Sequence, residues 1–231
     1  MELLLEGVRQ AVGLLLAGES EVWAILRLSL EVSGSATLVS LALGIPAGAA
    51  LALARFPGRA LVVSAVNSGM GLPPVVVGLF VTILLWRSGP LGGLEILYTP
   101  AAIVLAQAVI AAPIVTGITL AAVQSVPEAF RLQLLALGAS RVQMLWVVLR
   151  EARLPMLAAV MAGFGGVISE IGASMMVGGN IKGQTRTLTT AMVLETGKGN
   201  FEVAIALSLL LLVLVFLVNW ALTSIQQRRA L

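Results

Sequence analysis

Four long stretches of the sequence contain no charged residue, and these most constrain what the chain can fold into. They cover residues 32–54, 60–86, 96–127 and 203–227. Each is longer than the ~20 residues that an α-helix needs to cross about 30 Å of hydrocarbon. A fifth apolar stretch begins at Leu154 and continues past one acid, Glu170, to about Val177. The chain is therefore expected to cross a membrane five times.

Helix is the only spanning form that this pattern allows. In lipid, every backbone N–H and C=O must be paired within the protein, and the alternating pattern of a β-barrel is absent. Residues 3–18 are apolar but interrupted by Glu6 and Arg9, which favours an amphipathic interfacial helix. The predicted fold is an all-α, polytopic membrane protein with one transmembrane domain over residues 1–231. Its spanning helices are expected at residues 27–54, 61–86, 99–124, 155–177 and 203–225.

Composition excludes several classes of function. Hydrophobic residues make up 59% of the chain and charged residues 11%, whereas soluble domains average roughly 45–50% and about 25%. The 14 basic residues are scattered between apolar stretches, which argues against nucleic-acid binding. His, Cys and Asp are absent, which excludes disulfides, thiol and Ser-His-Asp catalysis, and His/Cys metal sites. We expect no metal, no cofactor and no enzymatic activity.

The basic residues suggest an orientation. With five spans, the connections at 55–60 and 125–153 share one side of the membrane with the C-terminus. That side carries eight of the 14 Lys and Arg residues, and the other side carries six. Because basic residues are in excess on the cytoplasmic side, we expect the N-terminus outside and the C-terminus in the cytoplasm, in a plasma or inner membrane.

The connection at residues 125–153 is far longer than the 2–8 residues that usually join two helices. It is helical in propensity and amphipathic, and Gly138-Ala139-Ser140 interrupts it, so it is predicted to form a helix–turn–helix on the cytoplasmic surface. Two interpretations remain open: a helix lying on the membrane, or an element that docks in a groove of a partner.

The same connection carries a resemblance to a known family. Ala-Leu-Gly-Ala-Ser at 136–140 and Leu154-Pro155 at its end resemble the "EAA loop" of binding-protein-dependent ABC importer permeases. In that family, the loop forms a coupling helix that sits in a cleft of a separate ATPase subunit. The resemblance therefore implies a coupling role for residues Glu128, Arg131, Leu137, Gly138, Ala139, Ser140 and Arg141.

Other segments resemble the molybdate and tungstate branch of these permeases, and are most similar to tungstate permeases. They are residues 51–59, 72–79, 87–92 and 169–197. The resemblance implies a type I importer fold, a homodimer, an ATPase subunit and an external solute-binding protein. It also implies that 178–202 is an external loop contacting the binding protein through Asn180, Lys182, Gln184 and Arg186.

The substrate implied by the resemblance is an oxyanion, with tungstate first and molybdate or sulfate as alternatives. Moving a dianion against a negative interior costs about 4.6 kcal/mol per 100 mV. The only clear acid in the middle of a span is Glu170, so the energy is expected to come from outside the chain. A stand-alone channel or ion-coupled carrier is the alternative from another class.

Two polar segments within the spans are candidates for the translocation path. The first is Asn67-Ser68-Gly69, at the start of a stretch with two Gly and two Pro that ends at Pro74. Broken helices are tolerated in membranes where they line a polar cavity, although a simple proline kink remains an alternative. Gly44 and Gly48 in the first span form instead a small-residue pattern typical of helix packing.

The second candidate segment contains Ser169, Glu170 and Ser174. In a continuous helix, Gly166, Glu170 and Ser174 would lie on one face. A carboxylate within a span is costly, so it is expected to face a cavity or a hydrogen-bond donor. Two interpretations of Glu170 stay open: a gate residue of the path, or a structural acid that accepts hydrogen bonds from a helix N-terminus.

Overall fold

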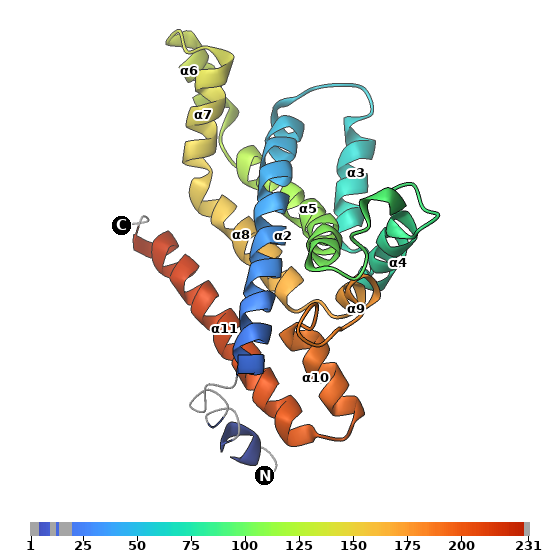
Figure 1. Cartoon of the computed structure of the whole chain (residues 1–231). Helices are drawn as coiled ribbons and strands as arrows, with labels where there is room; N and C mark the ends of the chain where they lie inside the picture. Colours follow the sequence, from blue (N-terminus) through green and yellow to red (C-terminus); the bar gives the residue numbers. More distant parts are fainter. Residues whose placement is uncertain (1–4, 10–12, 14–19, 229–231) are drawn as a thin grey trace.

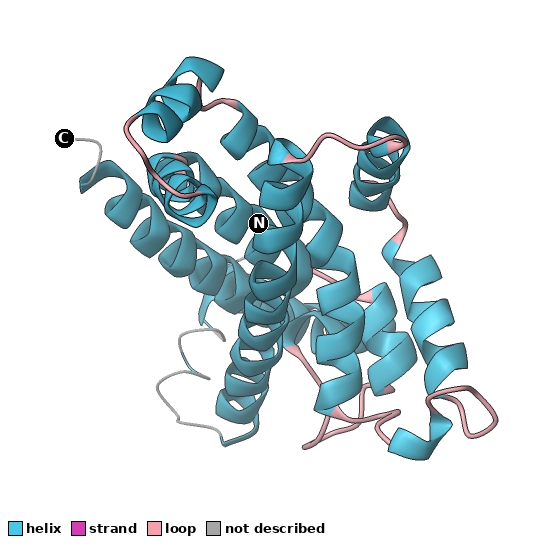
Figure 2. Cartoon of the chain, turned by 90° about the horizontal axis from the view of Figure 1, so that it is seen from above, coloured by secondary structure: helices cyan, strands magenta, loops and turns pink. Residues whose placement is uncertain are grey.

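The computed structural model describes residues 5–9, 13 and 20–228, and this part of the chain is helical with no strand (Figure 2). The elements are α2 Ser20–Leu53, α3 Arg59–Met70, α4 Pro74–Leu85, the 3₁₀ turn η1 Gly92–Leu94, α5 Pro100–Gln124, α6 Glu128–Ala136, α7 Arg141–Glu151, α8 Arg153–Ile168, α9 Gly172–Gly178, α10 Leu188–Gly197 and α11 Phe201–Arg228 (Figure 1). The all-α prediction is confirmed.

Three of these helices, α2, α5 and α11, are long and apolar enough to cross a membrane by themselves. Two further spans are broken pairs: α3 and α4 meet at 101°, and α8 and α9 meet at 59°. The described residues thus supply up to five spans if each bent pair counts as one.

The continuous helices expected at 61–86 and 155–177 are therefore wrong in detail. The first breaks after Met70, where Gly71-Leu72-Pro73 separates two helices of 12 residues each. Proline has no N–H to donate and clashes with the preceding turn. The second helix ends at Ile168, so Glu170 and Ser174 do not share a continuous helical face with Gly166.

Helices α2 and α5 form the centre of the bundle, where they pack closely (Figure 1). A Cβ atom at Gly48 would lie 2.5 Å from the carbonyl oxygen of Thr116, and one at Gly44 would lie 2.7 Å from Val115. Only glycine permits this approach, so the predicted packing role of both glycines is confirmed. Ser40 adds a hydrogen bond across the seam, donating to the Ala108 carbonyl at 3.2 Å.

Helices α6 and α7 form a hairpin that projects from one end of the bundle, at the top of Figure 1. We call this the hairpin end. An apolar cluster anchors the hairpin there, with Ala49 of α2, Val123 of α5 and Val148 of α7 among its buried members. Further from the hairpin, a second cluster joins α2, α4, α5 and α9.

The segment 178–202, expected as a loop, contains helix α10. A capping box at Thr187 begins this helix, and Leu188 and Ala191 pack with residues of α2 and α11. Of the expected interfacial helix at 3–18, only residues 5–9 and 13 are described, and the rest lies outside the described residues. Residues 5–9 are helical, and Gly7 approaches Ile205 of α11 closely.

Candidate functional site

The two helix breaks lie next to each other, near the middle of the molecule between the α6–α7 hairpin and α10 (Figure 1). Val75, just after the first break, is so close to Gly172, just after the second, that a Cβ atom there would lie 2.6 Å from its side chain. One turn further on, a Cβ atom at Gly78 of α4 would lie similarly close to the backbone of Ala173. Segments about 100 residues apart in the sequence thus form one irregular region.

Glu170 caps the helix that follows the second break. Its Oε1 accepts a hydrogen bond from the Ala173 backbone N–H at 2.9 Å, and the residue is buried. A carboxylate at a helix N-terminus satisfies a free donor and interacts favourably with the helix dipole. Thr189, at the start of α10, donates to the Glu170 carbonyl at 3.0 Å. These bonds agree with the structural interpretation of this acid.

Gln107 of α5 supports the same break from the other side. Its Nε2 donates to the Val167 carbonyl at 2.9 Å and to Ser174 Oγ at 3.3 Å. The side chain is 2% exposed, and its Oε1 has no hydrogen-bond partner. Of the predicted path residues, Ser174 is therefore buried and committed to this contact, while Ser169 is exposed and bonds back to Gly165.

Asn67, Ser68 and Gly69 lie in the last turn of α3, just before the first break. Asn67 and Ser68 are exposed in the single chain, and α3 has no buried residue at all. Gly69 faces α5, where a Cβ atom would lie 2.9 Å from Pro113. The polar pair is therefore available to a neighbouring surface, whereas the glycine serves packing.

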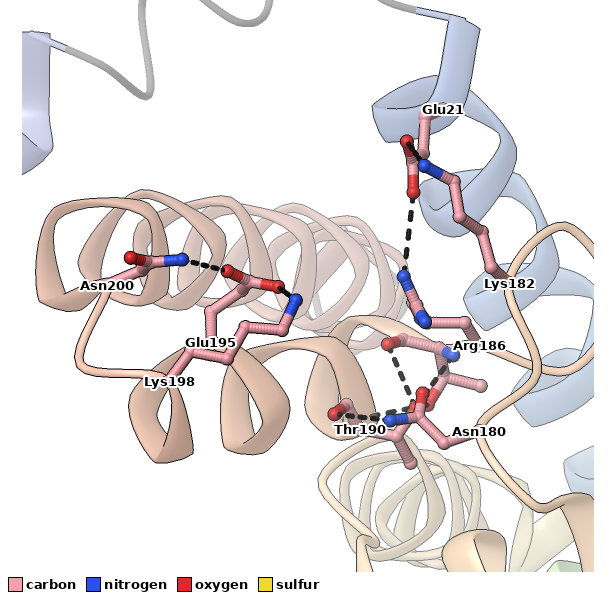
Figure 3. Close-up of polar contacts among 9 residues, drawn as sticks. Glu21, Asn180, Lys182, Arg186, Thr190, Glu195, Lys198 and Asn200 are labelled. Atoms are coloured by element: carbon pink, nitrogen blue, oxygen red, sulfur yellow. Dashed lines mark hydrogen bonds and ion pairs between the residues drawn. The ribbon is translucent and has the colours of Figure 1, made fainter.

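The loop between α9 and α10 holds the four residues predicted to contact a binding protein, of which Figure 3 labels three. Asn180 turns inward and donates to the Thr190 carbonyl at 3.2 Å. Lys182 and Arg186 both reach Glu21 at the start of α2, at 2.6 and 3.6 Å. Gln184 is exposed.

The predicted coupling residues lie on the hairpin or next to it. Glu128 begins α6 and pairs with Arg55 of the α2–α3 loop at 2.9 Å, while Arg131 has a buried Nε without a partner. Gly138 in the turn has φ +86°, a conformation that costs other residues about 1–2 kcal/mol. Ser140 forms a capping box with Gln143, which sets where α7 begins.

The hairpin also exposes large apolar side chains. Leu137 is 85% exposed, next to the exposed Gly138 and Arg141, and Ala139 is half-buried. Arg150 stacks over the ring of Trp146 at 5.3 Å. Exposed apolar patches of this kind mark interaction surfaces. The large apolar residues exposed on the hairpin are Leu132, Leu135, Leu137, Val142 and Trp146.

The model of the family described as "Binding-protein-dependent transport system inner membrane component" matches residues 44–231. The chain belongs to this family. As an inner membrane component, it is a multi-pass membrane protein, and the predicted resemblance is confirmed.

Curated relatives of this inner membrane component are permeases. It is 45% identical over 201 residues to a probable anion ABC transporter permease protein of Haloferax volcanii, covering 85% of this chain and 87% of that protein. It is 37% identical over 227 residues to the tungstate uptake system permease protein TupB of Peptoclostridium acidaminophilum, with 98% and 100% covered. It is also 30% identical over 220 residues to the molybdenum transport system permease protein ModB of Escherichia coli, with 90% and 96% covered.

Solved structures support the fold of this inner membrane component. The inward-facing MetNI methionine ABC transporter matches with a TM-score of 0.72 at 21% identity, over 90% of this chain and 94% of that one. A second crystal form of that transporter matches with a TM-score of 0.73 at 22% identity, over 91% and 98%. The predicted importer-permease fold is confirmed.

Three residues that shape the candidate site of this inner membrane component were not predicted from the sequence. Gln107 could have been noticed, because an amide within a long charge-free stretch needs a partner inside the membrane. Thr189 and Glu21 carry no such signal, since their roles depend on elements 19 and 161 or more residues away. Among the described residues, no three His, Cys, Asp or Glu side chains gather as for a metal ion.

Proposed function

We propose that this chain is the permease subunit of an ATP-driven importer for an oxyanion, with tungstate as the first candidate. The observation that carries the proposal is the 37% identity to a tungstate permease along 98% of the chain. Relatives named for anions and molybdenum support the wider class. Molybdate and sulfate are therefore the alternative substrates to be tested beside tungstate.

Energy would enter through the α6–α7 hairpin. A separate ATPase subunit is the proposed partner, and the exposed apolar side chains around Leu137 are suited to a groove on it. Glu128, Arg131, Gly138, Ala139, Ser140 and Arg141 would position this surface. The pair between Arg55 and Glu128 would tie the hairpin to the α2–α3 loop, so that both move together.

The path would run along the two adjacent helix breaks in a homodimer. Helix α3 has no buried residue in the single chain, and its polar Asn67 and Ser68 are exposed, which suits a seam between two copies. Ser169, also exposed, would line the same seam. Glu170, Ser174 and Gly69 would shape it from behind, through the helix cap, the bond from Gln107 and the contact with Pro113.

The hairpin end would face the cytoplasm and the α9–α10 loop would face outward. The excess of basic residues on the hairpin side supports this orientation, with the N-terminus outside and the C-terminus inside. An external solute-binding protein would then deliver the anion to the surface formed by Asn180, Lys182, Gln184 and Arg186.

The test is transport in proteoliposomes that contain this chain with its ATPase. Tungstate uptake is expected only when ATP is inside and the binding protein is outside, with less uptake of sulfate. Uptake by the chain alone would overturn the proposal in favour of a channel or carrier. Failure of tungstate, molybdate and sulfate in the complete system would overturn the oxyanion class.

A further inference from the structure

A pocket of about 510 Å³ opens between the start of α2 and the α9–α10 loop. Its charged lining consists of Glu21, Arg27, Glu31, Lys182 and Arg186. Arg27 and Glu31 neutralise each other through a 2.7 Å ion pair within α2. The remaining three charges, one carboxylate and two cations, decide what the pocket can bind.

Glu21 lies across the two cations, with one oxygen directed at each (Figure 3). Its Oε2 is 2.6 Å from Lys182 Nζ, and its Oε1 is 3.6 Å from Arg186 Nη1. The second distance exceeds hydrogen-bond length. The single negative charge of Glu21 is therefore shared between two cations, and one positive charge is left without a counter-charge.

Arg186 has donor capacity that the protein leaves unused. Its side chain is 16% exposed, yet its Nε is buried and without a hydrogen-bond partner. A buried guanidinium donor left unpaired is costly, and a planar guanidinium is well suited to oxyanions. The acid Glu195 interacts with Arg186 through its charge, but its oxygens already accept from Lys198 at 2.6 Å and from Asn200 at 2.8 Å, and it does not pair with the Arg186 Nε.

We propose that Lys182 and Arg186 form an external binding site for a tetrahedral dianion, and that Glu21 occupies this site until the dianion displaces it. A tetrahedral oxyanion presents pairs of oxygens as a carboxylate does, but its two charges match both cations. The displaced Glu21 is 42% exposed and can be solvated. This inference rests on the proposed oxyanion function and adds Glu21 as the competing group.

The test measures tungstate affinity by calorimetry on the transporter assembled in nanodiscs, without binding protein or nucleotide. Glu21→Gln is expected to tighten binding about fivefold, the upper range for freeing one exposed ion pair. Glu31→Gln is the matched control, because it removes the same charge from the same pocket and frees Arg27, but it releases neither Lys182 nor Arg186. It is expected to leave the affinity within about twofold.

Two further measurements make the result decisive. Lys182→Gln, at a 67% exposed position, is expected to weaken tungstate binding, and the monoanion perrhenate is expected to bind more weakly than tungstate. Equal tightening by Glu21→Gln and Glu31→Gln, or no change in Glu21→Gln, would overturn the displacement model. Wild-type tungstate uptake in complete proteoliposomes separates that failure from a failure of the proposed function.

Discussion

Gln107 and Val167 lie 60 residues apart, and the Gln107 side-chain amide donates to the Val167 carbonyl at 2.9 Å where helix α8 ends. The last carbonyls of a helix have no partner within it. Lipid offers none either. The α5 amide therefore stabilises a break in the neighbouring span, and the Glu170 cap stabilises the other side of the same break.

Replacement of Gln107 by Leu is expected to lower stability by about 0.5–1.5 kcal/mol, because the Val167 carbonyl loses its side-chain donor and keeps only the Glu170 backbone N–H at 3.2 Å. Thermal unfolding of the purified transporter measures the change, and tungstate uptake should fall with it. Thr116→Val on the same helix is the control, since the Thr116 hydroxyl donates to the Ala112 carbonyl within its own helix. Similar losses in both variants would contradict the special role of the break.

Gly48→Ala should destabilise the α2–α5 seam by about 1–3 kcal/mol, since a methyl group there overlaps the Thr116 carbonyl. Gly34→Ala, in the same helix, meets nothing within 4 Å. It should be neutral or stabilising by up to ~1 kcal/mol. Unfolding midpoints of the two variants in one detergent make the comparison. Equal effects would show that the seam tolerates a methyl group.

Gly138→Leu should weaken coupling to the ATPase. A side chain at this position meets nothing within 4 Å, so the penalty comes from φ +86° and is about 1–2 kcal/mol in the hairpin turn. The readouts are co-purification with the ATPase subunit and stimulation of ATP hydrolysis by loaded binding protein. Gly138→Asn, which tolerates this conformation better, should retain more coupling. Full coupling in the Leu variant would contradict the role of the turn.

The ionisation of Glu195, at the α10–α11 turn, is expected to make stability depend on pH. Hydrogen bonds from Asn200 and Lys198 lower the pKa of this carboxyl. A lowered pKa stabilises the fold above the unfolded-state value of about 4.3, and the contribution is lost as pH falls through the folded-state value. The difference in unfolding midpoint between wild type and Glu195→Gln should thus be constant from pH 7 to about 5 and vanish at lower pH. A difference that persists in acid would contradict this.

Much of the fold could be predicted because the length of an apolar stretch can be read directly from the sequence. The stretches without charge located α2, α5 and α11, and the Gly138 interruption located the hairpin turn. The break at Gly71–Pro73 was signalled by its prolines, but the 101° angle depends on packing against α9. The break at Ser169 had no such signal, because no proline marks it and its support comes from Gln107 and Thr189.

The site was predictable in its residue types but not in its pairings. Lys182 and Arg186 were noticeable as cations in a glycine-rich loop. Their shared partner, Glu21, lies 161 residues from Lys182, and only the packing of α2 beside that loop brings the three together. Asn180 was placed in the contact surface, yet its amide bonds inward to Thr190, because φ +50° turns the loop there.

Helices α2 and α5 contribute buried residues both to the cluster under the hairpin and to the cluster that holds α4 and α9. Spans α3–α4 and α8–α9 are interrupted, so neither can carry a push along its axis as a single rod. The glycine-tight pair α2 and α5 therefore forms an unbroken connection between the cluster under α7 and the cluster that holds α4 and α9. We expect a movement of the hairpin to reach α4 and α9 through that pair, with the broken spans changing their angles in response.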